Sequence, residues 1–182
     1  SFAGQFHILS GNFRDVRALL NGVEIGTVDG ILADVGVSSY QLDQDERGFS
    51  FRRSGPVDMR MNREQGETAL ELIERLSQKE LTRILRQFGE EPFAHPIARS
   101  IHEWRDSGDE LNTQTLADAV RAAIPKRVRA KLKHHPATRT FQALRIAVNQ
   151  ELAVLDELIE SIPEMLNPGG RALIISFHSL ED

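Results

Sequence analysis

Residues 6–35 read FHILSGNFRDVRALLNGVEIGTVDGILADV, and this stretch decides the fold class. It opens with a short apolar run, residues 6–9, which predicts a strand. Apolar residues at helical spacing follow, namely Phe13, Val16, Leu19 and Leu20, and Gly22 is a stop signal for this helix. The apolar run 28–35 is bounded by glycines and predicts a second, buried strand. Because two strands joined through a helix favour a parallel sheet, the predicted fold class is α/β.

The segment from Thr68 to about Leu132 has purely helical spacing. Thr68 with Glu71, and Ser77 with Glu80, fit the capping-box pattern of a helix start. Helices are expected to end at Gly89 and Gly108, a cap is expected at Thr113, and Pro125 closes the last helix. Several helices without an intervening strand indicate a separate all-helical module.

Alternation returns in the last part of the chain. One long helix is predicted by an apolar stripe at Phe141, Leu144, Val148, Leu152, Leu155, Ile159 and Ile162. A turn at residues 167–170 and a buried strand at 172–177 follow. The simplest architecture is an α/β sheet interrupted by a helical insertion. The expected parts are residues 1–65, with the first strands and a polar loop, 66–134, with the helical insertion, and 135–182, with the long helix and the last strand.

Length and composition exclude several classes of protein. The chain has 182 residues and no cysteine, which excludes disulfides, cysteine-ligated metal sites and a thiolate nucleophile within it. No apolar run approaches the roughly 20 residues that a membrane helix needs. The chain begins at Ser1 without a methionine and stops directly after an apolar run, so we expect a segment of a longer protein, truncated at both ends.

The charge is unevenly distributed. Between Ala119 and Gln150 there is no acidic residue, yet eight of the 22 basic residues lie there. The remaining 14 basic residues face all 27 acidic ones, so this run carries +8 and the rest of the chain −13. The run favours binding of a polyanion, since Lys and Arg displace counterions from phosphates. A solvated helix face is the alternative reading.

The polar loop from Gln41 to about Gln65 is unusually long for a compact domain, and such loops are more often functional than idle. Basic and aromatic side chains alternate within it, at Arg47, Phe49, Phe51, Arg52, Arg53 and Arg60, with Asp58 among them. This alternation suits a flipped base and its flanking phosphates. The alternative is a surface loop whose phenylalanines tuck into the sheet edge and whose charges are solvated.

Three blocks carry a family resemblance. They are ILADVGVSSYQLDQDERGFSFRRSGPVDMRMN at residues 31–62, HPATRTFQALRIAVNQEL at 135–152, and the closing SFHSLED at 176–182. In this order they resemble the RsmH (MraW) family of bacterial methyltransferases. These enzymes use S-adenosylmethionine to methylate N4 of a cytosine in the decoding region of small-subunit (16S) ribosomal RNA. Departures from the family pattern are modest: Tyr40 where proline is usual, and Ser54 and Asn62 where aspartate is usual.

The resemblance implies a class I S-adenosylmethionine-dependent methyltransferase sheet of Rossmann-like type, with an inserted helical domain. On that fold this chain supplies the third, fourth and fifth strands. The family's glycine-rich cofactor loop, and the acidic residue that ends the second strand, would lie upstream of Ser1. We therefore expect this segment alone to bind S-adenosylmethionine poorly and to be inactive.

The resemblance assigns cofactor contacts to Phe13, Asp34 and Gln41. Phe13 would pack on the adenine, although its place on an apolar stripe equally predicts a core residue. Asp34 ends a buried strand, where open α/β sheets bind ligands, although it also suits a cap for the following turn. Gln41 rests on the resemblance alone.

The chemistry of N4 methylation makes Asp34 the candidate catalytic residue. The N4 lone pair is delocalised into the cytosine ring, so an N4 methylase must hold the amino group with hydrogen-bond acceptors in line with the methyl donor. Asp34 and the backbone that follows it are placed to offer acceptors. Absence of cysteine fits transfer to nitrogen, because transfer to ring carbon C5 usually needs a thiolate. The candidate substrate-binding residues are Ser38, Ser39, Arg47, Phe49, Asp58, Arg60, Lys126, Arg127, Arg129 and Arg139.

No metal is expected. His134 and His135 are adjacent and point in different directions on most backbones, and His178 equally suits a capping or core role. The expected partner is small-subunit ribosomal RNA or the 30S particle, in the cytoplasm and without a membrane. Two alternatives stay open: a non-catalytic RNA-binding module, and a methyltransferase of the same fold that acts on DNA or protein.

Overall fold

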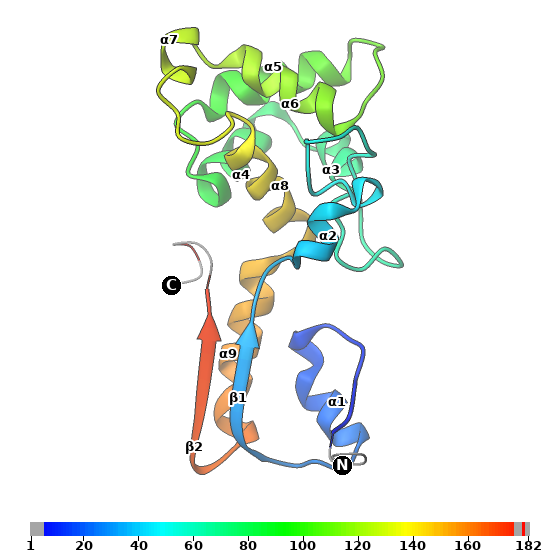
Figure 1. Ribbon diagram of the computed structural model, residues 1–182, viewed down its shortest axis with the longest axis vertical. Helices are drawn as coiled ribbons and strands as arrows, with labels where there is room; N and C mark the ends of the chain where they lie inside the picture. Colours follow the sequence, from blue (N-terminus) through cyan, green and yellow to red (C-terminus); the bar gives the residue numbers. More distant parts are fainter. Residues whose placement is uncertain (1–5, 177–179, 181–182) are drawn as a thin grey trace. The chain divides into compact units, whose positions relative to one another are not determined.

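The computed structural model describes residues 6–176 and Leu180, and the chain forms two compact units (Figure 1). The first, here called the sheet unit, contains the residues up to Gly36 and those from Glu151 onward. The second, the helical unit, is the continuous segment Val37–Gln150. The expected boundaries near residues 65 and 134 differ from these, because the polar loop and the helix after residue 137 pack into the helical core.

The sheet unit is built around two parallel strands, β1 (Val28–Asp34) and β2 (Leu166–Ile175). Its helices are η1 (Phe13–Asp15), α1 (Val16–Gly22) and α9 (Glu151–Met165). Leu32 pairs with Leu173, and Asp34 pairs with Ile175 at the carboxyl end of the sheet. The predictions of a helix after Phe13, a strand near 28–35 and a parallel sheet are therefore confirmed. The prediction that this strand is buried is wrong, because β1 is covered on one face only.

The two faces of this sheet differ. Ile31, Ala33 and Ile174 pack with side chains of η1, α1 and α9 around a small core of Val35, Leu155, Leu158 and Met165. On the other face Leu32 is 67% exposed and Leu173 is 62% exposed. Period-two alternation along β1 produces this division, since successive side chains point to opposite faces.

Two further expectations about the sheet are wrong. Residues 6–9 do not form a strand, and their apolar side chains are exposed, with Ile8 at 89%. An apolar run becomes a strand only where a neighbour completes its hydrogen-bond ladder, and among the described residues the sheet has two strands. Residues 167–170 do not form a turn ahead of the last strand. They lie inside β2 as an irregularity, where the register shifts between Val28 and Gly30.

The helical unit is closed around one apolar core. Its elements are α2 (Ser39–Asp43), η2 (Asp45–Arg47), α3 (Ala69–Arg75), α4 (Gln78–Gly89), α5 (Ala94–Arg105), α6 (Thr113–Ala123), α7 (Lys126–Arg129) and α8 (Thr138–Asn149). Leu85 of α4, Ile101 of α5 and Leu144 of α8 are fully buried in this core. Both predicted capping boxes are confirmed: the Thr68 and Ser77 hydroxyls accept from the backbone N–H of Glu71 and Glu80, 3.2 and 3.3 Å away.

The prediction of one long helix from the apolar stripe is also wrong, because the structure has two helices there. α8 ends at Asn149 and α9 begins at Glu151, because Gln150 adopts a left-handed conformation with φ 53°. The stripe divides accordingly: Leu144 packs in the helical core, while Leu155 packs in the sheet unit. At the start of α6 the expected cap is displaced by one residue, since Asn112 caps the helix and Thr113 is its first residue.

Candidate functional site

The carboxyl end of β1 carries Asp34, the candidate catalytic and cofactor-binding residue. Its side chain is exposed and on the same face of the sheet as Leu32. Among residues 6–176 and Leu180, no hydrogen bond or ion pair engages the Asp34 carboxylate. The backbone N–H of Val35 donates to Ile175 across the sheet at 3.4 Å, and Gly36 then turns the chain with φ 102°. A carboxylate is thus left available at the edge of the sheet where α/β proteins bind ligands.

Phe13 lies in the same unit and begins η1. Its ring is half-buried and packs against the cluster that contains Val35, the residue after Asp34. Figure 1 shows the start of η1 and the tip of the β1 arrow at the same end of this unit. Phe13 therefore packs against the core of the sheet unit, as its place on the apolar stripe predicts, and it is only partly buried there.

Ser38 and Gln41 form a capping box at the start of α2 in the helical unit. The Ser38 hydroxyl accepts from the Gln41 backbone N–H at 3.3 Å, and the Gln41 Oε1 accepts from the Ser38 backbone N–H at 2.9 Å. This pair has the Ser-x-x-Gln spacing of a capping box, so the signal for this helix start is present in the sequence. Ser39 is the first residue of α2, and its side chain lies outside the described part of the structure.

Arg47 stabilises the fold of the polar loop by hydrogen bonds to its backbone. Its Nη2 donates to the backbone carbonyls of Arg60 and Met61, each at 2.9 Å, and its guanidinium lies 5.7 Å from the ring centre of Phe49. Phe49 itself is buried in the helical core. These two candidate substrate residues therefore hold the loop against the core. This agrees with the alternative in which the phenylalanines of the loop are packed away, except that Phe49 enters a helical core and not the edge of the sheet.

Asp58 and Arg60 form a forked ion pair within the loop. Arg60 donates from Nε to Oδ1 at 2.7 Å and from Nη2 to Oδ2 at 3.0 Å, and the Asp58 side chain is almost fully buried. Burial by itself raises the pKa of Asp58, but hydrogen bonds from Arg60 and the charges of Arg60 and Arg63 outweigh it. The pKa of this carboxyl therefore lies below its ordinary value. A buried, ionised and fully paired carboxylate is a structural element of the loop.

Thr113 and Asn149 also fix the loop, and neither was singled out for this role. The Thr113 hydroxyl donates to the Arg53 carbonyl at 2.9 Å and accepts from the Gly55 N–H at 3.1 Å. At the end of α8, the Asn149 side chain accepts from the Met61 N–H at 2.6 Å and donates to the Met59 carbonyl at 2.7 Å. Both residues are distant from the loop in sequence, so no local pattern reveals these contacts.

Phe51 and His135 meet at the surface of the helical unit. Their ring centroids are 4.5 Å apart, and Phe51 also contacts Phe141 edge-on at 4.8 Å. Burial, together with the charge of Arg121, lowers the pKa of His135, which favours its neutral ring. The contact joins the polar loop to residues 135–152, and both segments lie in the blocks that carry the family resemblance.

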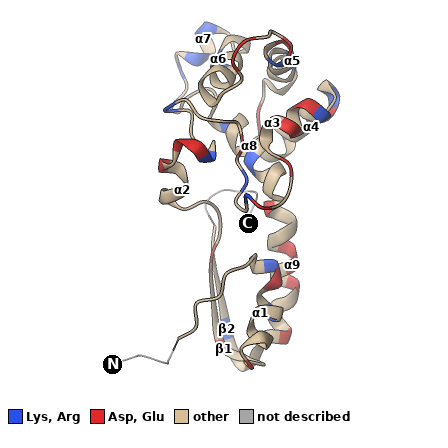
Figure 2. Cartoon of the chain, turned by 90° about the vertical axis from the view of Figure 1, so that its right-hand side faces the viewer, with Lys and Arg blue, Asp and Glu red and all other residues tan. Residues whose placement is uncertain are grey.

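The basic run is concentrated on α7 and the segment that follows it, where Figure 2 shows several Lys and Arg residues. Lys126 and Arg127 are exposed on α7, and Arg129 is half-buried there. Arg139 is exposed on α8 and donates to the Glu90 carbonyl at 3.0 Å, just beyond the end of α4. No hydrogen bond or ion pair between described residues joins the α7 cations to the Asp58–Arg60 pair.

The described ranges contain no group of three or more His, Asp or Glu side chains arranged to hold a metal ion. His178 lies outside these ranges. None of the described helices combines the length and apolarity needed to cross a membrane.

The fold and site define an α/β protein with a parallel strand pair and an exposed carboxylate at the carboxyl end of its sheet, joined to a helical module with a basic surface. Residues 1–182 match the MraW methylase family, and the chain belongs to that family of methyltransferases. It is similar to proteins named "Ribosomal RNA small subunit methyltransferase H". The one from Anaeromyxobacter sp. is 52% identical over 177 residues, which are 97% of this chain and 56% of the relative. The one from Trichlorobacter lovleyi is 50% identical over 181 residues, 100% of this chain and 58% of the relative.

A third relative, from Halorhodospira halophila, is 54% identical over 178 residues, which are 96% of this chain and 54% of that protein. The chain therefore spans slightly more than half the length of the curated relatives that it matches.

Proposed function

We propose that the full-length protein containing this chain transfers a methyl group from S-adenosylmethionine to N4 of a cytosine in the decoding region of small-subunit ribosomal RNA, in the cytoplasm. The match of the whole chain to a methylase family whose relatives are named for this class of RNA carries the proposal. The basic run of the helical unit supports an RNA substrate, since it offers phosphate contacts on an otherwise acidic chain.

The proposed complete fold is a class I methyltransferase sheet with the helical unit inserted into it. Parallel sheets are normally covered on both faces, yet one face of the β1–β2 pair exposes Leu32 and Leu173. The relatives are longer than this chain, so further strands and helices, including a glycine-rich cofactor loop, would complete the sheet. For this reason the segment alone is proposed to be inactive.

The residues at the end of β1 fit one part of S-adenosylmethionine. The half-buried ring of Phe13 offers an apolar surface for an adenine, and the Asp34 carboxylate is available for a hydrogen-bond donor. The Gln41 side-chain carbonyl is already used in the capping box, so only its amide nitrogen remains for a ligand. When bound, this cofactor would supply an electrophilic methyl group on a positively charged sulfur.

The chain's own part in the reaction is to hold the acceptor nitrogen and take up its hydrogen bonds. Bound S-adenosylmethionine would supply the methyl group that N4 accepts, and its sulfur would keep the electron pair of the bond that is given up. The methylated amino group would then release one proton to solvent. Asp34, exposed at the strand end, is the proposed acceptor that orients N4, and its carboxyl group would stabilise the positive charge that develops there.

The test is methyl transfer from labelled S-adenosylmethionine by the full-length protein, with naked small-subunit ribosomal RNA and 30S particles as substrates. Digestion to nucleosides and mass spectrometry are expected to find the label on N4-methylcytidine. RNA binding without methyl transfer would identify a non-catalytic RNA-binding module. Transfer to DNA or protein in place of RNA would identify a different substrate class.

A further inference from the structure

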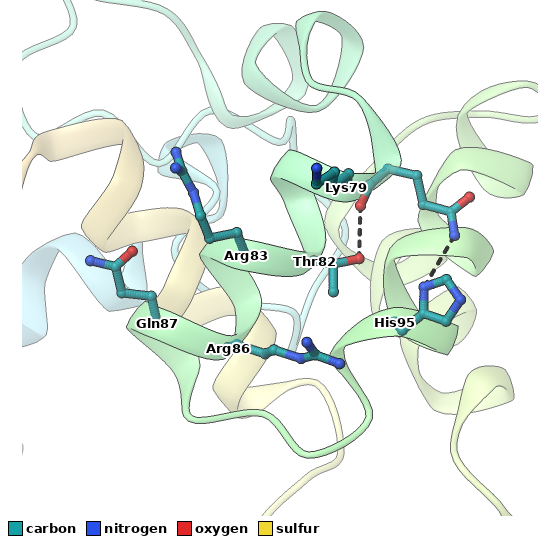
Figure 3. A pocket seen from close by; sticks show the side chains of 7 residues that line it. Lys79, Thr82, Arg83, Arg86, Gln87 and His95 are labelled. Carbon is teal, nitrogen blue, oxygen red and sulfur yellow. Dashed lines mark hydrogen bonds between the residues drawn. The ribbon is translucent and has the colours of Figure 1, made fainter.

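The exposed side of α4 forms a pocket of about 800 Å³ that is distinct from the strand end, the polar loop and the basic run. Its lining contains cationic and amide side chains and no acidic one: Gln78, Lys79, Thr82, Arg83, Arg86, Gln87 and His95. Figure 3 shows the lining side chains of α4 along that helix, with Thr82 between them and His95 on the neighbouring α5. Every ionisable group in the lining is thus a cation or an imidazole.

Helical spacing explains why these cations gather. Lys79, Arg83 and Arg86 are separated by four and three residues, so they share one side of α4 and extend over about 10 Å of its axis. The opposite side of α4 carries Leu81 and Leu85, which are fully buried. Charge counting along the sequence hides this surface, because residues 68–105 contain six acidic and six basic side chains.

Neighbouring cations of this region are held in ion pairs, whereas among the described residues the pocket cations are not, although the charge of Arg83 helps to lower the pKa of the nearby Glu80. Arg75 is bound by Glu67 at 2.6 Å, and Arg105 by Asp106 at 2.7 Å. Within the described residues, no hydrogen bond or ion pair engages the side chains of Lys79, Arg83 or Arg86. The nearby carboxylate of Glu80 is directed to its capping box, where the Ser77 hydroxyl donates to it at 2.6 Å.

We propose that this pocket-bearing side of α4 is a second phosphate-binding surface for ribosomal RNA, separate from the basic run. The inference rests on the proposed function, which supplies an RNA substrate. Unpaired guanidinium and ammonium groups bind phosphate oxygens, and the amide of Gln87 supplies further donors to phosphate and sugar. The Gln78 amide nitrogen is already 3.4 Å from Nδ1 of His95, to which it can hydrogen-bond. Contacts of this kind orient RNA on the protein without reading its sequence. The helical unit then holds RNA at two places, on α4 and around α7.

The test neutralises the three cations in the full-length protein as K79Q/R83Q/R86Q. Binding of a fluorescently labelled RNA containing the decoding region is measured by anisotropy over a series of salt concentrations. We expect Kd to rise about tenfold, and the slope of log Kd against log salt to fall by about 2, or roughly 0.7 for each lost phosphate contact. For methyl transfer, KM for RNA should rise while kcat stays unchanged.

The matched control is R17Q/R75Q/R99Q, which removes the same charge from exposed arginines already paired with Glu164, Glu67 and Glu103. It is expected to bind RNA like the wild type. The inference is overturned if the α4 variant keeps the wild-type Kd and salt slope, or if the control loses as much affinity. If the wild type transfers a methyl group and the α4 variant binds RNA as tightly as the wild type, the second RNA-binding surface is rejected. The proposed function is then still supported. A wild type that neither binds RNA nor transfers a methyl group rejects both.

Discussion

In the helical unit, apolar side chains from α3 to α6, α8 and the polar loop close around one core, whereas the sheet unit leaves an apolar face open. Leu144 of α8 is fully buried, while Leu32 of β1 is 67% exposed. The residues of the helical unit are continuous in sequence, and their apolar side chains pack against one another. The sheet unit combines two distant segments and has a parallel sheet packed on one side only. A continuous segment thus closes its own apolar core, whereas a parallel strand pair packed on one side leaves apolar side chains exposed.

The largest expected effect separates these two cores directly. Leu144→Ala should lower the free energy of unfolding of the helical unit by about 4 kcal/mol, because it leaves a cavity at a fully buried position. Trp104, the chain's only tryptophan and nearly buried on α5, reports this transition by its fluorescence in urea.

The matched change is Leu32→Ala in the same 182-residue chain. Since Leu32 is already exposed, amide hydrogen exchange along β1 should shift by less than about 0.5 kcal/mol. Comparable losses for both variants would contradict the difference between the two cores.

A smaller effect is expected from the buried ion pair of the polar loop. Asp58→Ala leaves the Arg60 guanidinium without its forked partner and should cost about 3 kcal/mol of helical-unit stability. Asp58→Asn, which keeps one acceptor oxygen, should lose less. Equal stability of the wild type and Asp58→Ala in the Trp104 assay would show that the loop does not depend on this pair.

Acid should remove the same contribution in the wild type. The folded-state pKa of Asp58 lies below its ordinary value of 3.8, so its stabilisation is fully present above that pH. It is lost as pH falls through the lowered folded pKa. The stability of Asp58→Ala should therefore decline less steeply in acid than that of the wild type, as measured by urea unfolding between neutral and acidic pH.

The hydrogen bonds between Asn149 of α8 and the polar loop should contribute less to the stability of the helical unit than the Asp58–Arg60 ion pair. Asn149→Ala removes one acceptor and two donated hydrogen bonds, and it leaves the Met61 N–H and Met59 carbonyl unpaired. We expect a loss of about 2 kcal/mol, with faster hydrogen exchange at Met61. Exchange at Met61 as slow as in the wild type would mean that this bond does not hold the loop.

Local signals predicted the parts of the fold that depend on local contacts. The capping boxes at Thr68 and Ser77, and the strand that ends at Asp34, follow from spacing and composition within a few residues. The break at Gln150 had no such signal, since a non-glycine residue adopts the left-handed conformation there. The apolar run 6–9 read as a strand because apolarity does not reveal whether a neighbouring strand is present.

The candidate site was predicted unevenly for the same reason. The resemblance assigns cofactor contacts to Asp34 and Phe13, and this assignment stays a prediction. The structure shows an exposed carboxylate at Asp34 and a partly buried ring at Phe13. Arg47, Phe49 and Asp58 have a composition suited to RNA, yet their side chains are used within the loop. Their partners lie on distant segments, so only tertiary contacts separate structural cations from available ones such as Lys79 and Arg83.

The most direct test of the whole account is Asp34→Ala in the full-length protein, assayed for both methyl transfer and RNA binding. The sheet unit is proposed to carry the chemistry and the helical unit the RNA. Methyl transfer should therefore fall at least about a hundredfold, while Kd for ribosomal RNA stays within about twofold of the wild type. Unchanged methyl transfer, or loss of RNA binding in proportion to activity, would contradict this division between the two units.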